Sequence, residues 1–315
     1  MQSVRKTMSY SRHRLLPLLY TTLGLYLIFL LLRYPGLSLQ YALTGLTLWF
    51  EKMIPTLLPF MILSGILISM NLTERFVRLL HPLLHCLYGT TPNGSYTMIM
   101  GFLCGFPMGA RVAGELRRKG RLSREEAQLL LAFCNNIGPI YLLSFVVSTL
   151  SLRQPLLPFL VMYGVPLVYG LVLMRLYAVR RPFSENTVEA ADCEPEGLLS
   201  AMDSSILSGL VGIGRLGGYM VFFNLLNILF VPFTHLPPFL LQLYNCILEI
   251  TSGISRCGQA HPYLALIALP FGGFSCIAQT YGMINGTDLT IRPYLIHKLI
   301  QTALTALCYF LLSLL

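Results

Sequence analysis

A series of long apolar runs constrains this chain more than any other feature. Six of them cover residues 15–32, 41–70, 125–150, 155–178, 204–232 and 293–315. A helix needs about 20 mostly apolar residues to cross the hydrocarbon core of a bilayer, and these runs are of that length or longer. Only 11% of the residues are charged, whereas a soluble domain has about 25%. The sequence therefore predicts an all-α polytopic membrane protein in contact with the lipid bilayer.

The basic residues predict how the chain is oriented. They gather before residue 15, in the loop 117–124, and at 180–181. Basic loops stay on the cytoplasmic side, so we expect these three segments, including the N-terminus, to be cytoplasmic. No small-residue cleavage site follows the run 15–32, which favours an uncleaved first helix in a multi-pass cell-membrane protein. The net charge of +9 lacks an accompanying aromatic-basic motif, so we expect no nucleic-acid partner.

Three interruptions by glycine, proline or asparagine break the apolar pattern. The stretch 92–114 must enter the membrane and return to the same face if 117–124 is cytoplasmic, with 101–107 as its tip. The stretch 261–284 is broken at 271–274, and the run 125–150 is broken at 135–139. Unpaired backbone groups in lipid cost several kcal/mol each, so such segments must face protein or a water-filled cavity. We therefore expect a polar cavity where they meet.

Short matches between the two halves predict an internal repeat. Residues 52–55 match 215–218, residues 105–107 match 272–274, and residues 119–123 match 285–290, at nearly constant separation. The first unit starts outside and the second starts inside, so the repeats are inverted. The predicted fold is two inverted repeats whose broken or re-entrant helices meet at the midplane, an arrangement typical of transporters.

Candidate site residues follow from these interruptions. A half-helix starting near Pro107 would point its N–H groups into the cavity, which favours an anion, and Arg111 would add a full charge. The predicted substrate-binding residues are Gly105, Phe106, Pro107, Gly109, Arg111, Asn135, Asn136, Gly272, Gly273, Ser275, Gln279, Lys52 and Arg215. Glu249 and Thr251 are the predicted ion-coupling residues, since an ionisable group at membrane depth is a functional candidate.

Structural alternatives stay open for several of these residues. The spacing of Gly101, Gly105 and Gly109 also suits close helix packing. Glu249 could instead neutralise Arg215 or Arg256, and Lys52 could pair with Glu51. The GxGxxG pattern at 212–217 lacks a preceding strand and is not a nucleotide site. No catalytic or cofactor motif is present. His81 and His85 have the i, i+4 spacing of metal ligands, but their place on an amphipathic helix favours interfacial histidines, so we expect no enzyme, no cofactor and no metal site.

Several of these motifs together resemble a known family. The blocks 105–111 (GFPMGAR), 131–139 (LAFCNNIGP), 248–253 (LEITSG) and 272–280 resemble the YlbJ/SpoVV sporulation integral membrane proteins. These belong to the nucleoside-recognition or Gate-domain group, which is similar to parts of concentrative nucleoside transporters. The resemblance covers residues 45–310.

The resemblance implies an organisation and a function. Residues 1–40 would be a basic segment and first helix, 41–178 and 200–315 two Gate-type repeats, and 179–199 a cytoplasmic linker. The implied function is export of dipicolinate, a small organic anion, towards the forespore across the mother-cell-derived outer forespore membrane. A coupling ion would be possible, and the oligomeric state is not predicted. The alternatives are a nucleoside or metal-ion transporter, with Cys104 and Cys276 as the telling residues for iron, or a non-transporting assembly protein.

Overall fold

The computed structural model describes residues 2–178, 197–232, 237–257 and 260–314, so most of the predicted linker 179–199 lies outside the described residues. Every regular element in these ranges is helical. Seven helices there are long and apolar enough to cross a membrane: 16–33, 35–69, 124–149, 156–177, 198–230, 262–284 and 291–313. The predicted all-α multi-pass architecture is confirmed.

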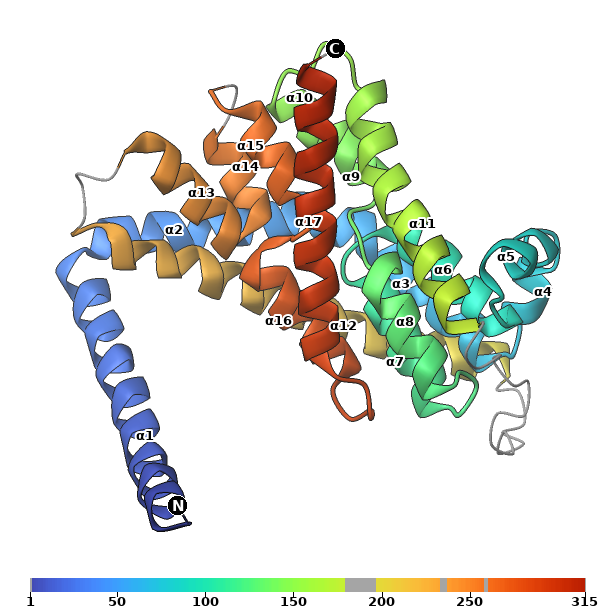
Figure 1. Cartoon of the computed structure of the whole chain (residues 1–315), viewed down its shortest axis with the longest axis horizontal. Coiled ribbons are helices and arrows are strands. Elements are labelled where there is room, and N and C mark those ends of the chain that lie inside the picture. Colours follow the sequence, from blue (N-terminus) through green and yellow to red (C-terminus); the bar gives the residue numbers. More distant parts are fainter. Residues whose placement is uncertain (1, 179–196, 233–236, 258–259, 315) are drawn as a thin grey trace.

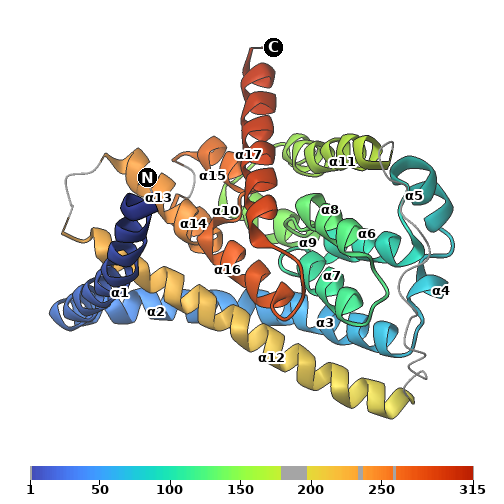
Figure 2. The same ribbon diagram turned by 60° about the horizontal axis from the view of Figure 1, so that its bottom comes forward.

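Two long helices pack along each other and support the other elements. Helix α1 (Gln2–Arg33) projects to one side, and α2 (Pro35–Leu48) then continues through a π-helical turn, η1 (Trp49–Met53), into α3 (Ile54–Ser69). Helix α12 (Leu198–Leu225) lies against α2 and α3 (Figures 1 and 2). A Cβ on Gly217 would lie 2.5 Å from the Trp49 ring, and Trp49 Nε1 donates to the Ile213 carbonyl at 2.8 Å. Gly212 and Gly217 of the GxGxxG pattern therefore serve helix packing, whereas a Cβ on Gly214 would have no neighbour within 4 Å.

The first helical hairpin lies where the sequence predicts a re-entrant segment. After the short helices α4 (Thr73–Val77) and α5 (His81–Tyr88), helix α6 (Pro92–Cys104) packs against α7 (Met108–Arg118), and residues 105–107 form the turn between them. The chain then enters α8 (Arg124–Cys134), is interrupted at 135–138, and continues through α9 (Pro139–Tyr141), η2 (Leu142–Val146) and α10 (Val147–Thr149). Helix α11 (Leu156–Ala178) completes this half.

The second half repeats this order of elements. A short 3-10 helix, η3 (Leu226–Phe230), follows α12. Helices α13 (Pro238–Leu248) and α14 (Ile250–Cys257) pack as a second hairpin with Glu249 at its turn. The next helix is interrupted at 269–272, between α15 (Pro262–Ala268) and α16 (Gly273–Ile284), and α17 (Ile291–Ser313) ends the chain. In Figure 1, α17 rises to the C-terminus while α11 descends from α10, which is consistent with inverted repeats.

The structure changes the residue pairing that the sequence predicts. The turn 105–107 corresponds to the turn at Glu249, and the interruption at 135–138 corresponds to the one at 269–272. Matching 105–107 with 272–274 is therefore wrong, because one is a hairpin turn and the other interrupts a helix that keeps its direction. A hairpin turn and a helix interruption can both be rich in glycine. The similar composition and constant spacing of these two segments therefore could not distinguish one from the other.

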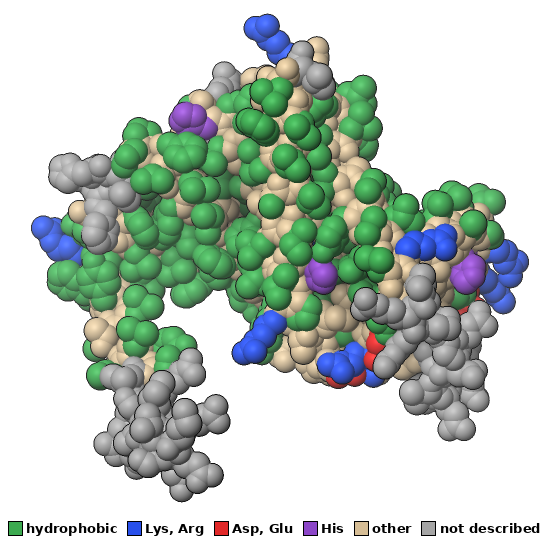
Figure 3. Space-filling model, in the orientation of Figure 1, with side chains coloured by type: hydrophobic (Ala, Val, Ile, Leu, Met, Phe, Trp, Pro, Cys, Tyr) green, Lys and Arg blue, Asp and Glu red, His purple; other side chains and the backbone are tan. Residues whose placement is uncertain are grey.

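The outer surface suits a lipid environment. Apolar side chains cover the central part of the face seen in Figure 3, and Lys and Arg side chains lie towards its edges. Many leucines of α11, α12 and α17 are exposed. At the end of α7, Arg117 binds both oxygens of Asp288 at 2.9 and 2.8 Å, and this pair links α7 to the 285–290 loop.

Candidate functional site

A cavity lies where the helix interruptions converge. Its volume is about 50 Å³, and both hairpin turns and both interrupted helices contribute to its wall. The π-helical turn between α2 and α3 and the middle of α12 complete it. The lining residues are Met53, Thr56, Leu57, Phe60, Leu103, Cys104, Phe106, Ile137, Gly138, Ile140, Tyr141, Leu216, Met220, Glu249, Ile250, Thr251, Cys276 and Gln279. A cavity is present at the predicted place, but its wall is mainly apolar, so the prediction of a polar cavity is wrong.

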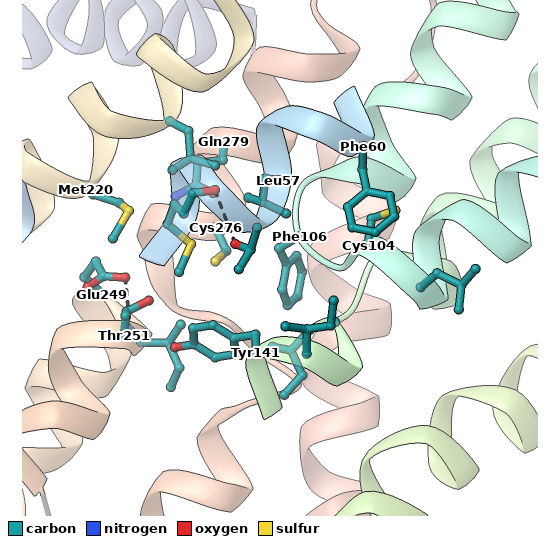
Figure 4. Close-up of a pocket in the computed structure, with 18 residues that line it drawn as sticks. Leu57, Phe60, Cys104, Phe106, Tyr141, Met220, Glu249, Thr251, Cys276 and Gln279 are labelled. Carbon is teal, nitrogen blue, oxygen red and sulfur yellow. Dashed lines mark hydrogen bonds between the residues drawn. The ribbon is translucent and has the colours of Figure 1, made fainter. Parts of the chain in front are cut away.

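The wall is aromatic and apolar, with few polar groups. Figure 4 shows Glu249 and Thr251 at one end, Phe60 and Cys104 at the other, and Phe106 and Tyr141 facing the space between them. Ligand sites commonly combine apolar walls with a few orienting polar groups. The cavity therefore combines an apolar wall with polar groups from Glu249, Thr251 and Gln279.

The glycines of the first hairpin allow its close approach to the interruption of α8. A Cβ on Gly101 would lie 2.4 Å from the Cys134 carbonyl oxygen, and one on Gly109 would lie 2.9 Å from the same atom. Gly105 has a φ of +87°, and a Cβ there would lie 2.3 Å from the Gly138 nitrogen. Gly101, Gly105 and Gly109 therefore serve close packing, which was the structural alternative for these residues. This packing places Phe106 at the cavity wall.

The predicted cations do not line the cavity. Lys52 and Arg215 are exposed. Arg111 is buried between α7 and α12, where it donates to Ser208 Oγ at 3.1 Å and lies 4.0 Å from Glu115. The helix start at Pro107 is also engaged, because Asn135 Oδ1 accepts from the Ala110 nitrogen at 3.3 Å. The expected cluster of positive groups facing a solute is therefore not assembled by these residues.

A buried lysine that the sequence argument passed over stands behind the cavity. Lys298 on α17 is fully buried, and its Nζ donates to Asn136 Oδ1 at 2.6 Å. The same Nζ lies 5.1 Å from the centre of the Phe106 ring. Asn136 is therefore the hydrogen-bond partner of a buried lysine. The sequence signal for this contact is Lys298 itself, the single lysine within the apolar run 293–315.

Glu249 forms the turn of the second hairpin and caps its second helix. Its carboxylate accepts from the Thr251 and Ser252 nitrogens at 3.0 and 2.8 Å, and from Asn224 Nδ2 at 3.3 Å. A carboxylate is favoured at a helix N-terminus, so this position has a structural role as well as a place in the wall. Neither Arg215 nor Arg256 forms an ion pair with Glu249 in the described part of the chain.

The start of α16 supplies the remaining predicted residues. Gly272 and Gly273 have φ values of +73° and +78°, and a Cβ on Gly273 would lie 3.0 Å from the Cys246 carbonyl. Ser275 is buried and accepts from Gln279 Nε2 at 3.0 Å. Of these four residues, only Gln279 lines the cavity.

Comparison with known proteins gives two matches. Residues 50–153 match the Gate family, described as nucleoside recognition, and this range contains the first hairpin and the interruption of α8. The chain is 28% identical to the "Sporulation integral membrane protein YlbJ" of Bacillus subtilis (strain 168) over 338 residues, which covers 94% of this chain and 82% of the relative. No solved structure matches. Both matches confirm the resemblance: the chain is similar to the Gate family over residues 50–153 and to YlbJ over most of its length.

Proposed function

We propose that this chain is a transporter that carries a small planar organic anion through the cavity, with dipicolinate as the first candidate. The observation that carries the proposal is the convergence of two hairpin turns, the interruption of α8 and the helix α16 on one cavity. Transporters commonly place their substrate site where broken helices of two repeats meet. Movement of one repeat against the other would expose this cavity first to one side of the membrane and then to the other.

The lining supports a planar solute in particular. Phe60, Phe106 and Tyr141 offer ring faces, while Glu249, Thr251 and Gln279 offer polar groups. The positive charge of Lys298 lies next to Phe106 without lining the cavity, and charges interact strongly at such short range in a water-poor interior. An aromatic anion would gain from both features. The similarity to a sporulation protein makes dipicolinate the first anion to test, with export towards the forespore across the outer forespore membrane as the proposed direction.

A nucleoside is the second candidate substrate. The matched family is described as nucleoside recognition, and Glu249 and Gln279 could hydrogen-bond sugar hydroxyl groups. A nucleoside is neutral, however, so Lys298 would contribute nothing to its recognition. A protein that only assembles sporulation membranes is the remaining alternative, and it predicts no flux.

Uptake of labelled dipicolinate into proteoliposomes tests the proposal. We expect saturable uptake that unlabelled uridine does not compete with and that Gln279→Leu reduces strongly. Gln40→Leu is the matched control, because Gln40 is an exposed glutamine on α2 that does not line the cavity. Uptake that uridine abolishes would favour the nucleoside. Folded protein with no uptake of either solute would contradict a transport function for these substrates.

A further inference from the structure

The ammonium group of Lys298 sits in a cage made of neutral oxygens and aromatic rings. Asn136 Oδ1 accepts at 2.6 Å and Gln301 Oε1 at 3.2 Å. The rings of Phe106 and Tyr294 lie 5.1 and 5.7 Å from Nζ, within the range of cation–π attraction. None of the ion pairs among the described residues includes Lys298. The cage therefore contains a cation and no carboxylate to neutralise it.

The end of α8 fixes the orientation of both amide groups. Asn136 Nδ2 donates to the Phe133 carbonyl at 2.5 Å, and Gln301 Nε2 donates to the Ala132 carbonyl at 2.8 Å. These carbonyls belong to the last turn of a helix that ends at Cys134, so they lack partners further along the helix. Because each NH₂ group is bound to a carbonyl, each amide oxygen must face the lysine.

This arrangement has the chemistry of an alkali-cation site. The carboxyl end of a helix carries partial negative charge, and carbonyl and amide oxygens are the ligands that hard cations prefer. In transporters, unwound carbonyls and the carboxyl ends of half-helices coordinate coupling cations. Here a side chain of α17, Lys298, supplies the positive charge beside the end of α8.

We propose that Lys298 is a tethered cation that fills the ion site at the interruption of α8, so that the protein needs no sodium or other alkali ion there. Only the transport test of this inference rests on the proposed function. What fills the cage can be tested by the stability of the folded protein alone. It gives the interruption of α8 an ion site different from the one predicted at Glu249 and Thr251.

Thermal unfolding of purified protein in detergent tests the cage without any transport. We expect wild-type protein to unfold at the same temperature in sodium chloride and in choline chloride. Lys298→Ala removes a propylammonium group, so its unfolding temperature should fall in choline chloride and recover when sodium or n-propylammonium is added. Lys298→Met fills the volume without the charge; it should be less stable than the wild type, and neither ion should restore it.

A lysine-specific effect is separated from general loss of charge by Arg292→Ala. Arg292 is an exposed residue of the same helix, so this variant should keep wild-type stability in both salts. Sodium-specific stabilisation of the wild type would overturn the proposal. So would a Lys298→Met variant as stable as the wild type, or a Lys298→Ala variant that neither ion stabilises.

Transport gives a second, separable result. If dipicolinate uptake is observed, Glu249→Gln removes the other predicted ion site, and uptake by this variant should be equal in sodium and choline media. Sodium dependence that remains in Glu249→Gln would overturn the tethered-cation proposal while leaving the transport function intact. If no uptake of any solute is observed, the proposed function fails, and the unfolding temperatures still decide what fills the cage.

Discussion

Gly101→Ala tests the close approach of the first hairpin to the interruption of α8. The new Cβ would lie 2.4 Å from the Cys134 carbonyl oxygen, whereas ordinary contacts begin near 3.4 Å, so the two backbones must separate by about 1 Å. Overpacking of this kind costs about 1–3 kcal/mol, and the better helix propensity of alanine returns about 0.5–1 kcal/mol. We expect a net loss of about 0–2.5 kcal/mol in the free energy of unfolding.

The assay is thermal unfolding in detergent beside a matched glycine substitution. Gly214 is also inside a helix, but a Cβ there would have no neighbour within 4 Å, so Gly214→Ala should be neutral or slightly stabilising. A loss of 1 kcal/mol lowers the midpoint by about 2–4 °C in larger domains, so Gly101→Ala should unfold several degrees below Gly214→Ala. Equal midpoints for the two variants would refute the argument that backbone contact at Gly101 positions the hairpin.

Three further predictions follow from contacts outside the cavity. Glu126→Ala removes the carboxylate that accepts from the Thr91 nitrogen and hydroxyl at 2.8 and 3.0 Å. Thermal unfolding should show a loss of about 1–3 kcal/mol in the free energy of unfolding. Glu125→Ala, at the exposed neighbouring position, should show no such loss. Asp288→Asn should lower the free energy of unfolding by only about 0.3–1 kcal/mol, because the ion pair between Asp288 and Arg117 is partly exposed. The Arg117 guanidinium lowers the pKa of Asp288. The stability that this pair contributes is therefore complete above the pKa of Asp288 in the unfolded chain, and it is lost as the pH falls through the pKa of Asp288 in the folded chain. A stability difference between Asp288→Asn and wild type that persists in strong acid would contradict this. Gly217→Leu should displace the ring of Trp49, the single tryptophan, and change its emission spectrum, whereas an unchanged spectrum would contradict the packing of α12 on η1.

The sequence predicted the helical architecture and the first hairpin because both leave strong compositional signals. Apolar runs of membrane-crossing length gave the long helices, and the requirement that 117–124 return to the basic side gave the turn at 105–107. The second hairpin turns at Glu249, which has no glycine or proline within three residues on either side. Its backbone is extended at Glu249, and the side chain caps the next helix, so no turn residue marked it.

The charges of the site were harder to predict because they depend on which side of a helix each residue faces. Lys52 lies in the π-helical turn η1, which alters the angular order of side chains along α2 and α3, and it faces outwards. Lys298 follows the opposite pattern: one lysine in a run of apolar residues barely changes the average hydropathy, yet its Nζ is buried among amide oxygens. Contacts of that kind depend on tertiary packing between α8 and α17.

Protection of a cavity cysteine by solute would show directly that the solute occupies the cavity. Cys276 lines the cavity, so a variant that keeps Cys276 as its one cysteine reports on this space through its rate of alkylation by a small thiol reagent. We expect dipicolinate to slow alkylation of Cys276 in a saturable manner, and a non-aromatic dicarboxylate to have little effect. Transport of dipicolinate by this variant with no change in the alkylation rate at saturating solute would contradict the account, because the solute would then pass elsewhere than the meeting point of the interrupted helices.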